Sequence, residues 1–298
     1  MALHKPAHPV GGGVGPGFDR EAVEMAADVS AKGGGRVVAA FWLFAQRGQN
    51  DLVEVAREAA AERRGIGAAV ARAMAEQGAH VICASRKVAA CQVVADEIVA
   101  NGGKASAMTV HLGDVAALGQ VVADIEKAHG RLDILVNNGA TNVFYGPAHK
   151  CPEDAYDKTF EVNVKGPYFL TAYAIPLMLK GGGGAVVNVA SIDGVNPGVF
   201  RAVYGMTKAA VINMTKGFAK EYGNKGIRVN ALLPGLTDTK LASALKEMPG
   251  IDRFMQENLA ISRMAQPEEM VGAVLLMVSD EGSYMTGESI TVDAGATI

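Results

Sequence analysis

A tyrosine and a lysine one helical turn apart are the residues of this chain best suited to chemistry. Tyr204 and Lys208 stand four positions apart, so on a helix they share one face. A phenol has an ordinary pKa of about 10, and a nearby cation favours its charged form. The spacing therefore predicts a proton donor and acceptor that works near neutral pH, where it can exchange a proton with a carbonyl or an alcohol.

A serine is placed to assist this pair. Ser191 follows the apolar run 185–190, which predicts a buried parallel strand, and it precedes Tyr204 by thirteen residues. Ligands of open α/β sheets bind beyond the carboxyl ends of the strands, so the hydroxyl is expected to hold the reacting oxygen. Taken singly, the serine could cap a turn and the Tyr/Lys pair could be a solvated helix face. Their order and strand context favour chemistry.

The whole composition indicates a globular α/β chain. It has 298 residues, of which 49% are hydrophobic and 20% charged, with a formal net charge of −3. The lack of a basic block argues against a nucleic-acid partner. Cys83, Cys91 and Cys151 are scattered, so we expect reduced packing residues and no metal site. The most apolar window, 37–45, is too short to cross a bilayer, and we expect a cytoplasmic protein without a membrane partner.

Short apolar runs alternate with stretches of helical period from residue 65 onward. This alternation predicts a Rossmann-type doubly wound parallel sheet. The predicted strands are 80–84, 105–111, 134–137, 185–190, 227–233 and 289–292. Long helices are predicted over 153–179 and 203–222, and a mobile segment with short helical pieces, 234–263, is expected to cover the site.

With these motifs in this order, the chain resembles the short-chain dehydrogenase/reductase family from Arg64 to its C-terminus. It is most similar in look to carbonyl reductases and alcohol dehydrogenases that act on apolar carbonyl compounds. Asn163, Ser191, Tyr204 and Lys208 match the family's catalytic tetrad. The resemblance implies that Tyr204 is the acid/base and that Ser191 steadies the carbonyl oxygen. It also implies that Lys208 lowers the tyrosine pKa and holds the nicotinamide ribose, while Asn163 positions a water.

The resemblance also implies a set of cofactor contacts along the carboxyl edge of the sheet. Those contacts are the glycine turn Gly65, Ile66 and Gly67, the adenosine neighbours Asn137 and Gly139, Asp114 at the adenine ring, and Pro234, Gly235, Thr237 and Thr239 at the nicotinamide carboxamide. The run 137–140 reads Asn-Asn-Gly-Ala where the family has Asn-Asn-Ala-Gly.

Charge at the end of the second strand favours NADP(H) over NAD(H) as the cofactor. An NAD site wants a carboxylate there for the ribose hydroxyl, and an NADP site wants a cation for the 2′-phosphate. The position holds Ser85, followed by Arg86, with Arg64 in the glycine turn. A guanidinium pairs well with a phosphate. The alternative is that Arg86 and Lys87 merely begin a solvated helix.

The N-terminus departs from the family pattern. Ala61 stands where the first glycine of the phosphate loop belongs, and 51–59 reads as a helix instead of the expected first strand. Either 35–44 supplies a substitute strand and 46–63 is an insertion, or residues 1–63 come from a foreign reading frame. We expect a flexible tail over 1–35 and a single domain over 36–298, of which 36–63 is atypical.

The leading hypothesis is an NADP(H)-dependent oxidoreductase that interconverts a carbonyl and an alcohol on a small apolar substrate. One alternative is a 3-oxoacyl thioester reductase, which shares the tetrad. The other is a non-catalytic protein of the same fold whose phosphate loop no longer holds a dinucleotide. Family resemblance implies a homotetramer or homodimer built through the two long helices, although their apolar faces could equally be ordinary core.

Overall fold

The computed structural model of the chain describes residues 36–41, 65–246 and 249–298. The tail expected over 1–35, the insertion expected over 46–63 and Arg64 lie outside these ranges.

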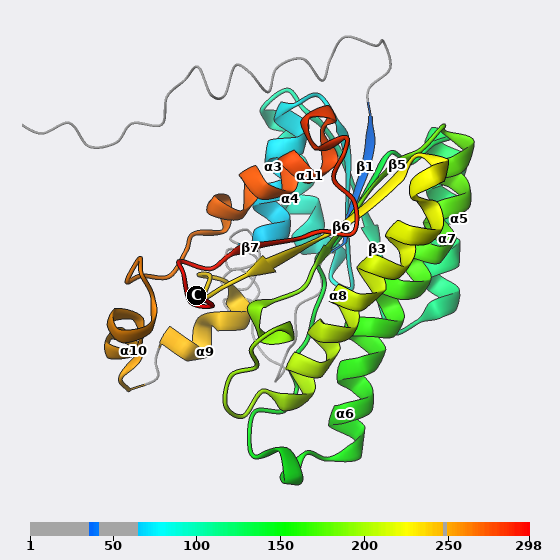
Figure 1. Ribbon diagram of the computed structural model, residues 1–298. Coiled ribbons are helices and arrows are strands. Elements are labelled where there is room, and N and C mark those ends of the chain that lie inside the picture. The colour runs from blue at the N-terminus through cyan, green and yellow to red at the C-terminus, as the bar shows by residue number, and fades with distance from the viewer. Residues whose placement is uncertain (1–35, 42–64, 247–248) are drawn as a thin grey trace, which may run out of the picture.

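Seven parallel strands form one sheet in the order β3-β2-β1-β4-β5-β6-β7 (Figure 1). The strands are β1 (Val37–Phe41), β2 (His80–Ser85), β3 (Lys104–Thr109), β4 (Ile134–Asn137), β5 (Gly184–Val189), β6 (Ile227–Pro234) and β7 (Ser289–Val292). The predicted strands from residue 80 onward are confirmed, most of them within a residue at each end. The doubly wound parallel sheet is confirmed with them. Strands β1 to β3 follow one another toward one edge of the sheet, and β4 to β7 follow one another toward the other edge, so the strand order reverses between β1 and β4.

Strand β1 occupies the middle of the sheet, although it lies far upstream of the place that the family pattern gives it. It pairs in parallel with β2 on one side and with β4 on the other. Its side chains alternate: Val37 and Ala39 join one hydrophobic core, and Val38 joins the other. The substitute strand within 35–44 is therefore confirmed, and the reading-frame hypothesis stays a prediction.

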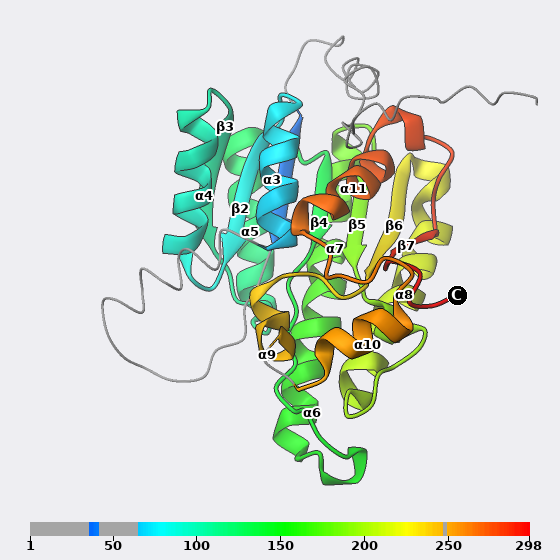
Figure 2. The ribbon, with the colours of Figure 1, turned by 90° about the vertical axis from the view of Figure 1, so that its left-hand side faces the viewer.

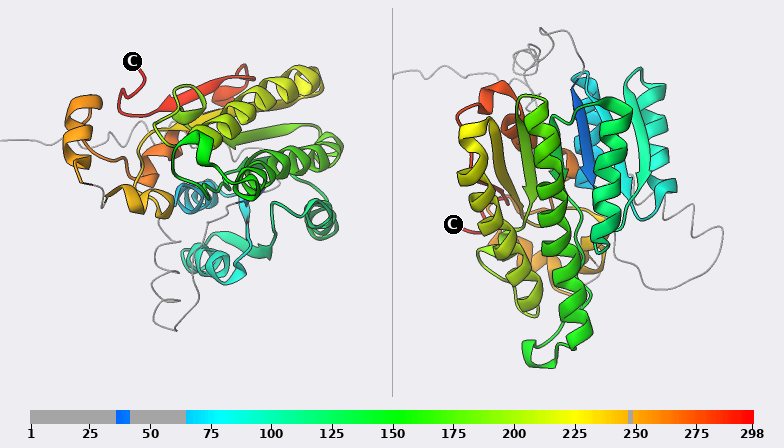
Figure 3. Two further views of the ribbon diagram at one scale, coloured as in Figure 1. Left: turned by 90° about the horizontal axis from the view of Figure 1, so that it is seen from below. Right: turned by 90° about the vertical axis from the view of Figure 1, so that its right-hand side faces the viewer.

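Helices cover both faces of the sheet (Figures 2 and 3). One face carries α5 (Val115–His129), α7 (Gly166–Lys180) and α8 (Ala202–Tyr222), and the other carries α3 (Ile66–Glu76), α4 (Val88–Ala100) and α11 (Val271–Val278). Each helix turns an apolar stripe inward, for example Leu118 and Ile125 of α5 into one core and Cys91 and Ile98 of α4 into the other. The two cores fix the sheet and leave its carboxyl edge for function.

The long helix predicted over 153–179 is confirmed, and it contains a π-helical turn that the sequence pattern did not predict. It consists of α6 (Glu153–Phe160), a π-helical turn η3 (Glu161–Lys165) and α7. Gly166 follows this turn, and a Cβ there would lie 2.5 Å from the carbonyl oxygen of Leu112. Such π turns are frequent at functional sites, and this one contains Asn163. The helix predicted over 203–222 is confirmed as α8.

The segment after β6 runs beyond the carboxyl ends of the strands (Figure 2). It forms η6 (Lys240–Ala242), α9 (Ser243–Lys246) and α10 (Ile251–Asn258), so the short helical pieces expected there are confirmed. The remaining short turns are η2 (Ala148–Lys150), η4 (Ile192–Gly194), η5 (Gly223–Lys225), η7 (Pro267–Met270) and η8 (Asp280–Gly282). Within the described ranges, none of the helices has the length and apolar character needed to cross a membrane.

Candidate active site

Ser191 is carried to the site by the turn that follows β5. It caps η4, and its hydroxyl accepts a hydrogen bond from the backbone N–H of Asp193 at 3.1 Å. Two glycines let this turn approach α8 closely, because a Cβ on Gly194 would lie 2.8 Å from the backbone of Lys208 and one on Gly205 would lie 2.8 Å from the Asp193 carbonyl. The close approach brings the Ser191 hydroxyl near the Tyr204 phenol, where it acts to lower the pKa of that phenol.

Tyr204 and Lys208 share the buried face of α8, as their spacing predicts. Both residues are buried, and the Lys208 Nζ lies 5.5 Å from the centre of the Tyr204 ring. The same Nζ donates a hydrogen bond of 2.8 Å to the carbonyl of Val189, the last residue of β5. The lysine is therefore anchored to the strand that also delivers Ser191.

The electrostatics of the pair differ from the sequence expectation. Burial raises the pKa of Tyr204 above its ordinary value, and the Asp193 carboxylate raises it further, while Arg201 and the bond from Ser191 act in the opposite direction. Burial lowers the pKa of Lys208 to about 8, against the pull of Asp193. In this structure burial dominates the electrostatics of the phenol, and the expectation that Lys208 lowers the pKa of Tyr204 stays a prediction. Tyr204 is held as a neutral phenol, which is a proton donor.

Asn163 holds two parts of the site together. Its amide exchanges two hydrogen bonds with the backbone of Thr141 in the loop after β4, at 2.7 and 2.8 Å. Its Nδ2 also donates to the Thr207 hydroxyl at 3.0 Å, and that hydroxyl donates to the carbonyl of Tyr204 at 2.7 Å. The structure thus brings Asn163 to the same corner as Ser191, Tyr204 and Lys208. Its role in holding a water stays a prediction.

A partly buried ion pair that the sequence reasoning missed borders this corner. The Asp193 carboxylate is 3% exposed, and it accepts hydrogen bonds from Arg201 Nη1 at 2.7 Å and from the Gly198 N–H at 2.9 Å. Asp193 comes two residues after Ser191, and Arg201 comes three before Tyr204. Their short sequence distance from Ser191 and Tyr204 could have marked Asp193 and Arg201 as candidate site residues.

The far end of the carboxyl edge holds the residues predicted to select the cofactor. Ser85 is buried, and its hydroxyl bonds the backbone N–H and carbonyl of Lys87 at 3.2 and 3.1 Å, so it shapes the turn into α4. Arg86 is half-buried at the end of β2, where burial lowers its pKa. The Val110 N–H bonds the Ser85 carbonyl at 3.0 Å, which places His111 beside Arg86.

His111 is a second residue that the sequence reasoning missed. Its Nδ1 accepts a hydrogen bond from the Gly113 N–H at 3.0 Å, so the neutral ring carries its proton on Nε2. Burial and the nearby Lys158 and Arg86 lower its pKa. The rule that selects residues just beyond a strand could have found it, because it lies two residues after the end of β3.

Two predicted cofactor contacts have clear structural partners. Asp114 is exposed and caps α5 by accepting a hydrogen bond from the Ala117 N–H at 3.1 Å. Asn137 is buried, and its amide donates to Thr171 at 2.9 Å and to Asn188 at 2.8 Å. The buried Oδ1 of Asn137 has no hydrogen-bond partner among the described residues, and the adenosine contacts of both residues stay predictions. Gly139 is buried in the loop after β4.

The N-terminus of α3 fits an anionic group. Gly65 is its N-cap, without a side-chain cap, and Ile66 and Gly67 form the first turn. Free backbone N–H groups and the helix dipole favour negative charge at such an end, as a dinucleotide pyrophosphate requires.

The loop after β6 is fixed by its backbone. The Gly235 N–H donates to the Val292 carbonyl at 2.9 Å, and a Cβ on Gly235 would lie 2.6 Å from the Cα of Asp293, so only glycine fits. Thr237 is buried, and its hydroxyl donates to the Gly235 carbonyl at 3.1 Å. Pro234 ends β6, and the Thr239 N–H bonds the Thr237 carbonyl at 2.9 Å. The four predicted residues therefore stand together at the carboxyl edge.

Within the described residues, Cys83, Cys91 and Cys151 form no disulfide. Cys83 and Cys91 are buried, as expected of packing residues, and burial raises the pKa of the Cys83 thiol to about 12. In the described part of the chain, no three His, Cys, Asp or Glu side chains are grouped so that they could hold a metal ion.

A parallel sheet with polar residues at its carboxyl edge and an uncapped helix after its central strand defines a Rossmann-type nucleotide-binding fold. A family model described as enoyl-(acyl carrier protein) reductase matches residues 60–297. Dehydrogenase/reductase SDR family member 4 of Oryctolagus cuniculus is 38% identical over 232 residues, which cover 78% of this chain and 89% of that protein. The chain belongs to the short-chain dehydrogenase/reductase family, and it is an NAD(P)-dependent oxidoreductase of that family.

Solved structures agree with this assignment. A gluconate 5-dehydrogenase from Burkholderia cenocepacia J2315, in complex with NADP and tartrate, superposes with a TM-score of 0.78 at 25% identity and covers 88% of this chain and 95% of its own. A 3-oxoacyl (acyl-carrier-protein) reductase from Agrobacterium tumefaciens C58 with NADP bound gives 0.76 at 28% identity, with 88% and 94% covered.

Proposed function

We propose that this chain is an NADP(H)-dependent oxidoreductase that interconverts a carbonyl and an alcohol on a small apolar substrate. The observation that carries the proposal is that the buried side chains of Tyr204 and Ser191 meet in one corner, with the Lys208 ammonium 5.5 Å from the phenol ring. Two hydroxyl groups that meet in this way can both bond one substrate oxygen, as polarisation of a carbonyl requires.

Each residue has one task in this mechanism. A bound nicotinamide would supply the hydride for the carbonyl carbon in reduction and would accept it from the alcohol in oxidation. Tyr204 gives its proton to the carbonyl oxygen during reduction and takes it back during oxidation, and Ser191 donates a hydrogen bond to the same oxygen. Lys208 stabilises the phenolate that forms. Asn163 keeps the loop after β4 against α8 through Thr141 and Thr207.

The cofactor preference rests on charge at the end of β2. Ser85 leaves that position without a carboxylate, and Arg86 beside His111 offers cationic and hydrogen-bonding groups for a 2′-phosphate. The N-terminus of α3 would hold the pyrophosphate. Both solved relatives described above contain NADP, which supports NADP(H) over NAD(H).

The substrate side is lined by exposed apolar residues from two loops. Tyr145, after β4, meets Phe200, before α8, edge to face at 6.3 Å between ring centres. Both rings are about half exposed, and Val199 beside them is 76% exposed. Exposed apolar area of this kind suits the apolar part of a ketone or aldehyde.

A second candidate is a 3-oxoacyl thioester reductase. The match to a family model described as enoyl-(acyl carrier protein) reductase and the likeness to a solved 3-oxoacyl reductase favour it. The test is NADPH consumption by the full-length protein with a panel of aryl ketones, aliphatic aldehydes and a 3-oxoacyl thioester, run beside Tyr204→Phe. The proposal is supported if the wild type turns over ketones and the Tyr204→Phe variant does not. Turnover of the thioester alone selects the second candidate, and none with any substrate points to a non-catalytic protein.

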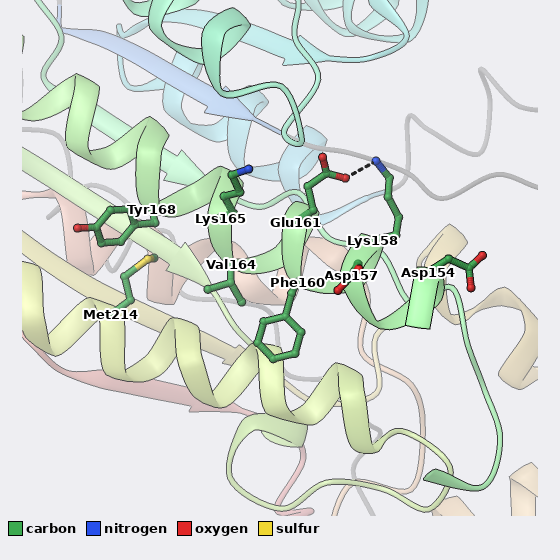
Figure 4. Close-up of a pocket in the computed structure, with 9 residues that line it drawn as sticks. All are labelled: Asp154, Asp157, Lys158, Phe160, Glu161, Val164, Lys165, Tyr168 and Met214. Atoms are coloured by element: carbon green, nitrogen blue, oxygen red, sulfur yellow. Dashed lines mark hydrogen bonds and ion pairs between the residues drawn. The ribbon is translucent and has the colours of Figure 1, made fainter. Parts of the chain in front are cut away.

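We also propose a homotetramer or homodimer in the cytoplasm. The outer side of α6, η3 and α7 facing α8 carries a hollow of about 760 Å³ (Figure 4). Phe160, Val164, Tyr168 and Met214 line it together with charged residues, and the exposed rings of Tyr156 and Tyr173 lie on the same helices. A second copy would cover this apolar area. Light scattering on the purified chain tests the assembly, and a monomeric mass would overturn it.

A further inference from the structure

We infer that Asp193 and Arg201 form a positioning pair, which holds Ser191 and the turn before α8 in the arrangement that catalysis requires. This inference rests on the proposed function of Tyr204 and Ser191. Its basis is a bond between a carboxylate that is 3% exposed and a guanidinium group, 2.7 Å long, at the border of the catalytic corner.

The pair closes the loop between the two catalytic elements. Asp193 lies in η4, two residues after Ser191, and Arg201 is the N-cap of α8. The Asp193 carboxylate also accepts a hydrogen bond from the Gly198 N–H at 2.9 Å. One side chain therefore holds both Gly198 and Arg201 against η4. A Cβ on Gly198 would lie 2.6 Å from Arg201 Nη2, which shows that the guanidinium packs directly on the loop backbone.

The pair also touches the hydrogen-bond network of the reaction. The Asp193 Oδ2 lies 3.5 Å from the Ser191 hydroxyl, and the Asp193 N–H donates to the same hydroxyl at 3.1 Å. Ser191 in turn lies close enough to Tyr204 to lower the pKa of its phenol. A shift of Asp193 would therefore move the serine that holds the substrate oxygen.

The two charges act on the phenol with opposite signs. The groups that face Tyr204 in the described structure are Ser191, Lys208, Asp193 and Arg201. Asp193 raises the pKa of Tyr204 and Arg201 lowers it. Loss of the carboxylate should stabilise the phenolate, and loss of the guanidinium should destabilise it. A residue with a purely structural role would not produce opposite shifts.

The experiment compares Asp193→Asn, Arg201→Gln and Arg201→Lys with the wild type in pH profiles of alcohol oxidation. The rising limb reports deprotonation of the Tyr204 site. We expect it to move to lower pH in Asp193→Asn and to higher pH in Arg201→Gln. Because misplacement of reacting groups is costly, kcat should fall about 10- to 100-fold in Asp193→Asn, with KM and NADPH affinity changed less than about threefold. Arg201→Lys should recover part of the activity and of the wild-type limb.

Lys180→Gln serves as the matched control, because it breaks the exposed ion pair of Lys180 with Glu126 far from the site. It should leave the pH profile unchanged. The inference would be overturned if the rising limb moved in the same direction in Asp193→Asn and Arg201→Gln, or did not move in either. It would also be overturned if NADPH affinity fell by the same factor as kcat.

Failure of the proposed function would be visible separately, as absence of turnover in the wild type. In that case the effect of Asp193 on Tyr204 is measured by NMR of the ¹³C-labelled tyrosines. The Tyr204→Phe variant identifies which signal belongs to Tyr204. A moved Tyr204 signal in Asp193→Asn supports the contact, and an unmoved one overturns it.

Discussion

The catalytic corner and the adenosine corner of the carboxyl edge are built differently. At the catalytic corner, Asn163, Lys208 and Asp193 are nearly fully buried and make hydrogen bonds to distant parts of the chain. At the adenosine corner, Ser85 and Asp114 bond backbone groups two or three residues away. Tertiary contacts therefore fix the first corner. At the second corner they hold Asn137, while local turns hold Ser85 and Asp114.

This difference predicts how each corner responds to substitution. A change in the catalytic corner leaves buried partners unsatisfied, so it should cost stability as well as rate. A change at the adenosine corner should alter cofactor affinity and little else. The following predictions test the contrast, from the largest effect to the smallest.

Tyr204→Phe removes the proton donor and leaves the ring in place. General acid catalysis contributes about 10²- to 10⁴-fold, so kcat should fall by that factor while NADPH affinity stays within about threefold. Steady-state rates and a fluorescence titration measure the two quantities. A variant that keeps more than a tenth of the activity would show that another group carries the proton.

Asn163→Ala should be the most destabilising change in the catalytic corner. It leaves the N–H and carbonyl of Thr141 without their side-chain partner, and an unsatisfied buried polar group costs about 1–3 kcal/mol. We expect a loss of about 2–4 kcal/mol in the free energy of unfolding by urea. Asn101→Ala is the control, because its side chain bonds the Glu97 carbonyl at an exposed helix end. Equal losses in the two variants would contradict the contrast.

Lys208 should make stability depend on pH. Its pKa is about 8 in the folded chain and about 10.4 unfolded, so the unfolded chain binds more protons between these values and stability rises with pH there. Lys208→Met removes this contribution. Relative to that variant, the wild type should gain about 2–3 kcal/mol from pH 8 to pH 10. Parallel curves in this window would show that the lysine is not desolvated.

Arg86→Ala should change cofactor affinity alone. A hydrogen bond to a charged group contributes about 1.5–3 kcal/mol, so NADPH should bind about 10- to 100-fold more weakly. NADH affinity and the melting temperature should stay as in the wild type. Lys127→Ala removes an exposed cation on α5 as the control for net charge. An equal loss for both cofactors would remove Arg86 from 2′-phosphate recognition.

Sequence patterns predicted the sheet well because each buried strand is a short continuous run of apolar residues. The apolar runs at 134–137 and 289–292 correspond to β4 and β7 residue for residue. The central strand β1 was found only as one of two alternatives, because its pattern lies apart from the glycine turn. The π turn at Asn163 was missed, since its residues have the periodicity of an ordinary helix.

The chemistry of the site was only partly readable. The spacing of Ser191, Tyr204 and Lys208 predicted their meeting, because a strand end and one helix face suffice to place them. The raised pKa of Tyr204 could not be predicted from the sequence, because sequence shows charges but not burial. Asp193 and Arg201 were missed, since their bond depends on how a loop folds back.

The central claim is that this chain holds NADP(H) beside Tyr204. The most direct measurement is a fluorescence titration of the full-length protein with NADPH and, separately, with NADH. The account predicts saturable NADPH binding and NADH binding at least about tenfold weaker, as the loss of one charged hydrogen bond requires. Absence of binding of either cofactor by the folded protein would contradict it.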